Sequence, residues 1–254
     1  MKRQDRILYT LLLLLTVPAC AAQPSAEALS AFNTYAAGIE ARLAQQHRSP
    51  TGFLVPTNDA RRGDLVIEQL TPPNIPGAIL HHWRGTAFVA GATAADFEHL
   101  MRDFNSYPQH FAPEVLQAKT LTQHDDRLQA FMRVRQHHVI TVVMDTTYDV
   151  DFAHLDLRHG YSISRSTSIS EIDSADTPTQ HTLTDSESHG FLWRQNTYWS
   201  YEERDGGLVM QIESVSLSRS IPRGLGWAVR PFVESVPRES LEFTLRSACN
   251  ALRK

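Results

Sequence analysis

The chain has 254 residues, a formal net charge of -4 at pH 7 and 42% hydrophobic residues. This composition is typical of a globular protein with enough apolar side chains for a sizeable core. A mildly acidic chain without a run of basic residues excludes sequence-independent nucleic-acid binding, which needs clustered Lys and Arg opposite phosphates.

The first 22 residues predict a signal segment for export. Lys2, Arg3 and Arg6 form a positively charged region, a short apolar core spans residues 11–17, and small residues surround Cys20. The apolar run is too short to cross a bilayer core of about 30 Å. We therefore expect a periplasmic or secreted protein.

Cys20 leaves two forms of the exported protein open. In the first, a signal peptidase removes the whole segment. In the second, residues 17–20 serve as a bacterial lipobox, which they resemble, and a lipidated Cys20 attaches the protein to a membrane. Pro18 fits that pattern poorly. Cys249 is the only other cysteine, so we expect no internal disulfide framework.

Residues 23–75 predict an N-terminal extension that contains one helix. Apolar side chains recur at helical spacing within residues 25–46 and form one stripe, which consists of Leu29, Phe32, Ala36, Ile39 and Leu43. Residues 63–70 predict a short strand, and the proline-rich stretch 71–77 ends it.

Residues 76–254 predict one domain that is rich in antiparallel strands. The expected strands span residues 78–91, 115–122, 128–138, 137–152, 161–173, 191–204 and 208–220. A helix is expected to begin after Thr93, which forms a capping box with Asp96, and to end at Tyr107-Pro108. Asp205-Gly206-Gly207 predicts a tight hairpin turn between the last two strands.

The end of the chain predicts how these elements pack. Residues 221–235 are expected to form a glycine- and proline-rich connection, and residues 236–252 an amphipathic closing helix. The strands do not alternate with helices, so the fold class is α+β rather than parallel α/β. A long strand followed by a terminal helix favours a curved antiparallel sheet that grips the helix and leaves a cavity between them.

From His82 to its end, the sequence resembles the START-like, or Bet v 1-like, helix-grip superfamily (SRPBCC), which also holds polyketide cyclases and Coq10-type proteins. The resemblance is carried by residues 79–89, by 96–115 with Tyr107-Pro108, and by 196–222 and 224–248. It implies a lipid, sterol, polyketide or isoprenoid ligand without selecting one. It says little about activity, because one fold hosts many functions.

We predict a binding protein for a small hydrophobic molecule, without metal, cofactor or nucleic acid. The candidate ligand-binding residues are large apolar or amphipathic side chains, together with one carboxylate, on the elements that surround the expected cavity. They are Phe104, Tyr107, Met144, Tyr148, Trp199, Met210, Ile212, Glu213, Trp227, Phe232 and Phe243. For Glu213, pairing with an arginine such as Arg165 or Arg194 is favoured over contact with a ligand.

Two other classes of function stay open. The first is an enzyme of the polyketide-cyclase or aromatase kind, with Glu213, Tyr148 or Arg135 as polar catalysts. The second is an envelope interaction module whose N-terminal helix docks a partner and whose cavity is collapsed. The sequence contains no nucleophile elbow, phosphate loop or metal-binding motif that would settle enzyme against carrier, and the non-enzymatic binding protein is the leading interpretation.

Overall fold

The structure, a computed structural model, describes residues 23–57, 65–137, 140–220 and 226–253. Side chains are described for all of these residues except 226–234. The helices are α2 (Ala26–Gln46), α3 (Ala94–Arg102), the single-turn 3-10 helix η2 (Phe104–Ser106), α4 (Tyr107–His110) and α5 (Gly226–Leu252). The strands are β1 (Val66–Leu70), β2 (Ala78–Ala90), β3 (Val115–His124), β4 (Arg127–His137), β5 (Thr141–Asp156), β6 (His159–Asp173), β7 (His181–Thr182), β8 (Arg194–Arg204) and β9 (Gly207–Arg219).

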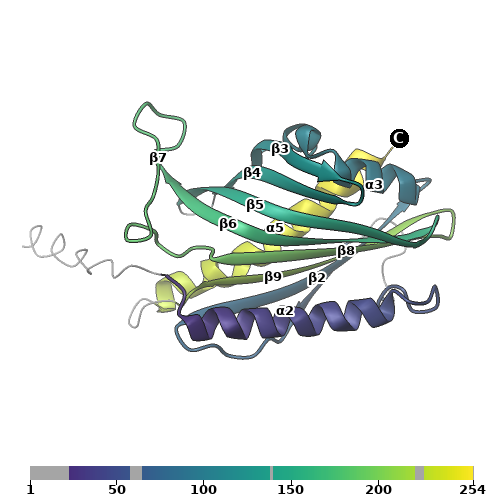
Figure 1. Cartoon of the computed structure of the whole chain (residues 1–254), viewed down its shortest axis with the longest axis horizontal. Coiled ribbons are helices and arrows are strands. Elements are labelled where there is room, and N and C mark those ends of the chain that lie inside the picture. The colour runs from purple at the N-terminus through teal and green to yellow at the C-terminus, as the bar shows by residue number, and fades with distance from the viewer. Residues whose placement is uncertain (1–22, 58–64, 138–139, 221–225, 254) are drawn as a thin grey trace, which may run out of the picture.

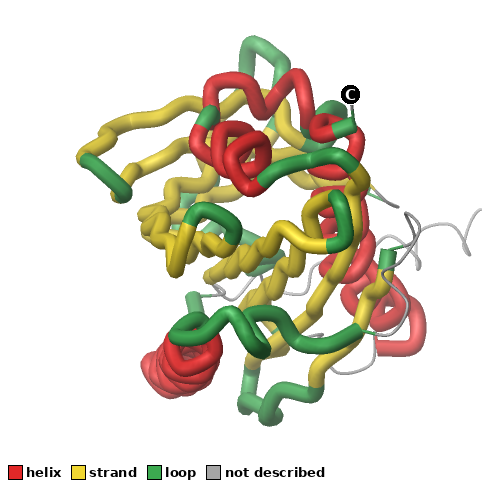
Figure 2. The backbone as a smooth tube through the Cα atoms, turned by 90° about the vertical axis from the view of Figure 1, so that its right-hand side faces the viewer, coloured by secondary structure: helices red, strands yellow, loops and turns green. Residues whose placement is uncertain are grey.

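All strands belong to one antiparallel sheet with the order β1-β2-β9-β8-β6-β5-β4-β3, and β7 pairs with β6. The helices α2 and α5 lie on opposite sides of this curved sheet (Figures 1 and 2). A register shift between Thr147 and Tyr148 interrupts the pairing of β5 with β6, and such bulges bend a strand. The α+β class and the sheet that grips the C-terminal helix are thereby confirmed.

The two faces of the sheet carry separate apolar clusters. On the inner face, Ile212 of β9 belongs to the same buried cluster as Leu241 and Leu245 of α5, and residues of α3 complete this cluster. The outer face packs against α2, where Phe32 and Leu217 are buried. The side-chain period of two along each strand separates the two clusters, so that Ile212 and Leu217 of β9 face opposite ways.

The hairpin turn and the capping box that the sequence predicts both form in the structure. Asp205 and Gly206 connect β8 to β9 with positive φ angles of 55° and 75°, which the type I′ turn requires. Thr93 accepts a hydrogen bond from the Asp96 backbone N–H, and the Asp96 carboxylate accepts one from the Thr93 N–H. This capping box fixes the start of α3 and confirms the prediction.

Two predicted helix boundaries were wrong. The helix that follows Thr93 ends at Arg102, and Tyr107-Pro108 instead begins α4. Proline suits the first turn of a helix, where its missing N–H has no intrahelical partner. The closing helix begins at Gly226 rather than at residue 236, so Pro231 and Pro237 lie inside it. An interior proline removes a backbone hydrogen bond and crowds the carbonyl of the preceding turn, which is why the sequence predicted a later start for this helix.

Candidate ligand-binding cavity

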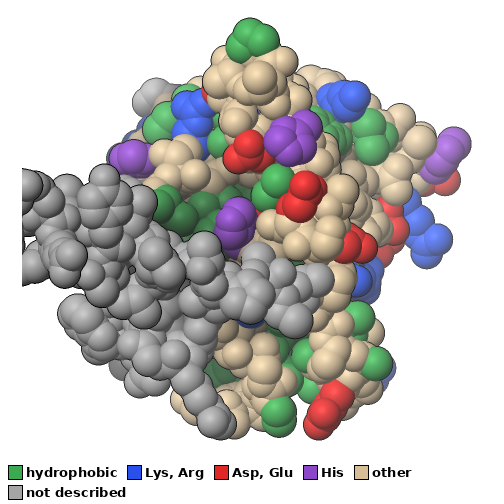
Figure 3. Space-filling model, turned by 90° about the vertical axis from the view of Figure 1, so that its left-hand side faces the viewer, with side chains coloured by type: hydrophobic (Ala, Val, Ile, Leu, Met, Phe, Trp, Pro, Cys, Tyr) green, Lys and Arg blue, Asp and Glu red, His purple; other side chains and the backbone are tan. Residues whose placement is uncertain are grey.

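A cavity of about 660 Å³ lies between the inner face of the sheet and α5. Its floor consists of the central strands β2, β9, β8 and β6, and its sides consist of β4, β5, the α3–α4 region and α5. Ile140, Phe191 and Ser220 lie at one end of it, and Ile140 and Phe191 are exposed to solvent. Figure 3 faces the corresponding end of the molecule and shows apolar side chains in a recess. The volume falls in the range of sites for small organic molecules.

Most of the candidate ligand-binding residues surround this cavity. Those that line it are Phe104, Tyr107, Met144, Tyr148, Trp199, Ile212 and Phe243. Trp227 and Phe232 lie outside the residues whose side chains the structure describes. Met210 does not line the cavity, because it is fully buried in the inner core beside the cavity. The structure thus brings together side chains from several separate elements, and their contact with a ligand stays a prediction.

The wall formed by α3 and α4 is apolar and aromatic. Tyr107 stacks on Phe104 with ring centroids 4.4 Å apart and lies 4.8 Å from the ring of Phe111. The Tyr107 hydroxyl donates a hydrogen bond of 2.9 Å to the Met101 carbonyl, and burial raises its pKa. Tyr107 therefore presents its ring to the cavity and keeps its polar atom satisfied within the protein.

Sequence reasoning missed the polar part of the lining. Ser214, Ser216 and Ser218 alternate along β9 and therefore share its inner face. Strand pairing places Gln195 opposite Ser216, and Thr197 opposite Ser214. The alternating serines of the segment SVSLS were the available signal, but without the sheet topology they are indistinguishable from serines that face solvent.

Two titratable groups that line the cavity beside its floor, His81 and Tyr148, are neutral near pH 7. Burial lowers the pKa of His81, which lies opposite Ser216, to about 4. Burial raises the pKa of Tyr148 to about 12, and its hydroxyl donates a 3.1 Å hydrogen bond to the Gln195 side-chain oxygen. The floor therefore offers hydrogen bonds and no net charge.

Glu114 is the carboxyl group that lines the cavity and titrates near neutral pH. It lies between α4 and β3 and accepts a 3.0 Å hydrogen bond from the Gln136 side-chain amide. Burial raises the pKa of Glu114 to about 7, the Gln136 hydrogen bond opposes the shift, and the neighbouring Glu239 adds to it. Both protonation states of Glu114 are therefore populated near neutral pH.

We expect Glu114→Gln to stabilise the protein increasingly as the pH rises. The folded-state pKa of Glu114 lies above its unfolded value, so its favourable contribution is complete below the unfolded pKa and is lost as the pH rises through about 7. Glutamine cannot ionise and avoids that loss. Thermal unfolding from about pH 5 to about pH 8 should show the melting temperature of the variant overtaking that of the wild type.

The exposed Asp185→Asn variant serves as a control for charge removal alone, because Asp185 lies on the surface loop after β7. A constant difference between Glu114→Gln and wild type across this range would contradict the raised pKa.

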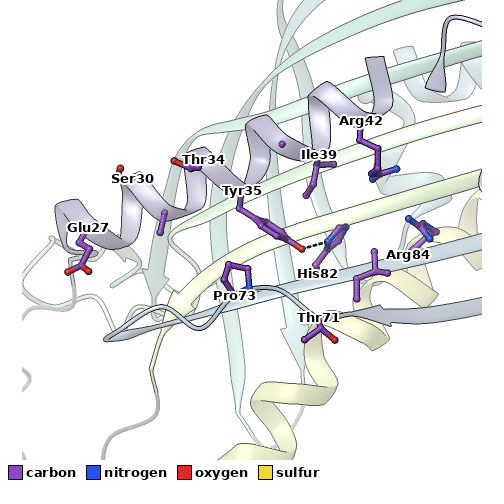
Figure 4. A pocket seen from close by; sticks show the side chains of 13 residues that line it. Glu27, Ser30, Thr34, Tyr35, Ile39, Arg42, Thr71, Pro73, His82 and Arg84 are labelled. Carbon is purple, nitrogen blue, oxygen red and sulfur yellow. Dashed lines mark hydrogen bonds between the residues drawn. The ribbon is translucent and has the colours of Figure 1, made fainter. Parts of the chain in front are cut away.

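A second group of charged residues lies on the outer face of the sheet, beneath α2. The Glu213 carboxylate accepts hydrogen bonds from Arg42 (2.6 Å), His82 Nε2 (3.0 Å) and Arg84 Nε (3.1 Å). His82 Nδ1 lies 2.9 Å from the Tyr35 hydroxyl (Figure 4). An open groove of about 890 Å³ borders this network, between α2 and the β1–β2 edge.

Electrostatics keep Glu213 ionised in this network. Burial raises the pKa of Glu213, but the His82 hydrogen bond and the charges of Arg84 and Arg42 outweigh burial and lower it to about 2. The ionised Glu213 accepts a hydrogen bond from His82 Nε2, and the other ring nitrogen of His82 lies within hydrogen-bond distance of the Tyr35 hydroxyl. Each of these polar groups has a partner within the protein, which identifies the network as the attachment of α2 to the sheet.

This geometry corrects the prediction for Glu213. Glu213 lies on the opposite face of the sheet from Ile212 and does not line the cavity. The favoured pairing with arginine is observed, but the partners are Arg42 and Arg84. Arg165 instead binds Glu40 and Asp151. The sequence could not reveal these partners because they lie on elements far apart in the chain.

Further charged side chains, and the cysteine of α5, have partners or packing within the protein. Arg133 binds Asp145 through two hydrogen bonds of 2.7 and 2.8 Å, and Arg135 binds Asp176. Cys249 is buried in α5, and burial raises the pKa of its thiol to about 11. Among the described residues, no three His, Cys, Asp or Glu side chains are arranged to hold a metal ion, and no helix has the length and apolar character to span a membrane.

Comparison with known proteins gives structural matches at low sequence identity. No protein-family model and no curated protein matches the sequence. The protein TTHA0849 from Thermus thermophilus matches with a TM-score of 0.47 and 13% identity, over 66% of this chain and 94% of that chain. A STAR-related lipid transfer protein from Xanthomonas axonopodis matches with a TM-score of 0.39 and 16% identity, over 69% and 98%.

The Zhui aromatase/cyclase from a Streptomyces species matches with a TM-score of 0.44 and 12% identity, over 68% of this chain and 93% of that chain. Solved structures of START and aromatase/cyclase proteins therefore match most of this chain.

Proposed function

We propose that the protein is an exported, non-enzymatic binding protein that holds one small hydrophobic molecule between the sheet and α5. The observation that carries the proposal is the cavity of about 660 Å³ with an aromatic and aliphatic wall. Transfer of apolar surface from water contributes roughly 25 cal/mol per Å², from which the costs of association are subtracted. An open cavity also argues against an interaction module with a collapsed interior.

Export is part of the proposal and rests on the sequence of residues 1–22. These residues, with Cys20, lie outside the described part of the chain. Intact mass spectrometry of the protein from its native envelope distinguishes the two processed forms. Removal of the segment lowers the mass, whereas a lipidated Cys20 at the new N-terminus adds the mass of acyl chains. A mature protein that retains residues 1–22 would contradict export through a cleaved signal.

Mass spectrometry of the bound molecule tests the binding function. Protein purified from its native host should release an organic-soluble compound at close to one molecule per chain, and native mass spectrometry should show the same complex before extraction. Protein that is consistently empty, and that also binds none of a panel of apolar fluorescent probes, would contradict the proposal.

A cyclase-like enzyme is the second candidate, and Glu114 is the observation that favours it. A carboxyl group with a pKa of about 7 at a cavity is suited to general acid–base chemistry. Incubation of wild type and Glu114→Gln with the extracted compound separates the two functions. An enzyme would convert the compound, and the variant would convert it at least about a hundredfold more slowly. A carrier would release it unchanged in both cases.

A further inference from the structure

The inner face of the sheet has a row of small polar side chains across its central strands. We call this row the polar belt, and it consists of Ser164 on β6, Gln195 and Thr197 on β8, and Ser214, Ser216 and Ser218 on β9. Strand pairing places Thr197 between Ser164 and Ser214. The belt is therefore continuous over three neighbouring strands and faces the cavity.

Within the described part of the chain, the belt has a polar group that the protein leaves unpaired. Ser218 is 7% exposed, and its hydroxyl has no hydrogen-bond partner among the described residues. A buried polar group without a partner is costly and occurs at few positions in a native fold. The outer network around Glu213 shows the opposite pattern, since its members bind one another. Ser218 lines the cavity, although its hydroxyl oxygen has almost no exposed surface, so a rotation of this side chain toward the cavity would let a ligand supply the missing partner.

The belt contains no ionised group. His81 and Tyr148, which flank it, are both neutral near pH 7. Arg219, Glu114 and His189 also line the cavity, but they belong to its edges and not to the belt. A permanently charged group on the belt would lose its hydration without gaining a counter-ion. The belt therefore selects uncharged hydrogen-bonding groups.

The side of the cavity across from the belt is mostly apolar, and its polar side chains Gln136, Ser240 and Thr244 make hydrogen bonds within the protein. Phe104, Met132, Leu241 and Phe243 form much of it. Hydroxyl groups on one side and rings and aliphatic chains on the other match a ligand whose own two faces differ in polarity.

We propose that the cavity binds an uncharged, facially amphipathic compound whose hydroxyl or carbonyl oxygens lie on the polar belt. This inference rests on the proposed binding function and narrows its ligand class. Hydroxylated alicyclic rings and oxygenated aromatic rings share this chemistry. Fatty acids and phospholipids, which place a charged head on an unbranched chain, lie outside it.

Three probes test the proposal by fluorescence competition on the full mature protein. Cortisol and progesterone share a ring system and are uncharged, but cortisol has additional hydroxyl groups, and palmitate supplies a charged head. We expect the double variant Ser214→Ala/Ser216→Ala to bind cortisol at least about tenfold more weakly, because each lost hydrogen bond is worth several-fold in affinity. Its affinity for progesterone should change less than about twofold.

Two further measurements distinguish a loss of hydrogen bonds between the belt and the ligand from a general disturbance of the fold. The control variant Ser168→Ala alters an exposed serine of β6 that does not line the cavity, and it should bind all three probes as the wild type does. The melting temperature of the double variant should be equal to or above that of the wild type, because the substitutions remove hydroxyls from the cavity floor that a ligand, and not the fold, is expected to satisfy.

The possible results have distinct meanings. If the double variant loses affinity equally for cortisol and progesterone, or loses affinity for neither, the polar belt does not bind the hydroxyl groups of the ligand. The proposed binding function itself would still stand. Palmitate that binds more tightly than both steroids, and that is released by Arg219→Gln, would replace the proposal with a charged-head ligand. Failure of every probe, together with protein that purifies empty, would overturn the binding function itself.

Discussion

Glu213→Ala is expected to lower the free energy of unfolding by about 3–5 kcal/mol, because it removes the shared anionic partner of a buried network. Glu213 is 2% exposed, and Arg84 and His82 are also largely shielded from water. The variant would leave a guanidinium group without its carboxylate partner beneath α2. A loss of this size is a large fraction of the total stability of a typical domain, about 5–15 kcal/mol.

Glu40→Ala is the matched control for this prediction. Glu40 also connects α2 to the sheet, through two hydrogen bonds to Arg165 of 2.9 and 2.8 Å. Its side chain and that of Arg165 are 25% and 38% exposed, so we expect the loss of this pair to cost about 1 kcal/mol or less. Urea unfolding of both variants gives the comparison. Equal losses would show that burial does not strengthen the Glu213 network.

The stability that Glu213 contributes has a defined pH dependence. Its folded-state pKa, about 2, lies below the unfolded value, so the contribution is complete above the unfolded pKa and declines as the pH falls toward 2. The difference in unfolding free energy between wild type and Glu213→Gln should therefore shrink as the pH falls below the unfolded pKa. Hydrogen exchange should show the amide protons of α2 losing protection first, because the network joins that helix to β2 and β9.

Thr197→Trp is expected to abolish ligand binding without unfolding the protein. Thr197 lies at the middle of the cavity floor on β8, between Ser164 and Ser214. An indole ring at this position would occupy part of the space of about 660 Å³, and tryptophan is well accepted in strands. Affinity for the extracted compound should fall at least about a hundredfold, since a steric clash with the ligand costs several kcal/mol.

Thr167→Trp is the matched control, because Thr167 is an exposed threonine on β6 that does not line the cavity. Native mass spectrometry of both variants measures the fraction of protein that carries ligand, and circular dichroism confirms that both are folded. A Thr197→Trp protein with ligand at the wild-type stoichiometry would place the binding site elsewhere.

The parts of the fold that the sequence predicted correctly depend on local physics. Thr93 and Asp96 lie within one turn of each other, and Asp205-Gly206 needs only its own φ angles. The inward position of Tyr148 and Ile212 follows from strand alternation, once the apolar face of each strand is known. The predicted ends of the helices were wrong at Tyr107-Pro108 and at Gly226, because proline both begins and interrupts helices.

The candidate site was only partly predictable for a related reason. Glu114 and His81 were not selected, since a shifted pKa depends on burial by residues distant in the chain. Glu213 was placed in the cavity because its neighbours Ile212 and Val215 are apolar. Both faces of β9 are buried, one by α5 and the other by α2, so an apolar neighbour does not tell which face a residue occupies.

Short-range periodicity and turn chemistry are enough to specify the class of fold, the succession of strands along the chain and the aromatic residues that reach the interior. Which polar groups find hydrogen-bond partners depends instead on contacts between segments that are distant in the chain. Pairing of β9, β8 and β6 brings small polar side chains from different segments into one row beside the cavity, and on the other face α2 and β2 supply the arginine partners of Glu213. Hydrogen bonds between distant segments are created only when the chain folds, so the polarity of the site is a property of the assembled sheet.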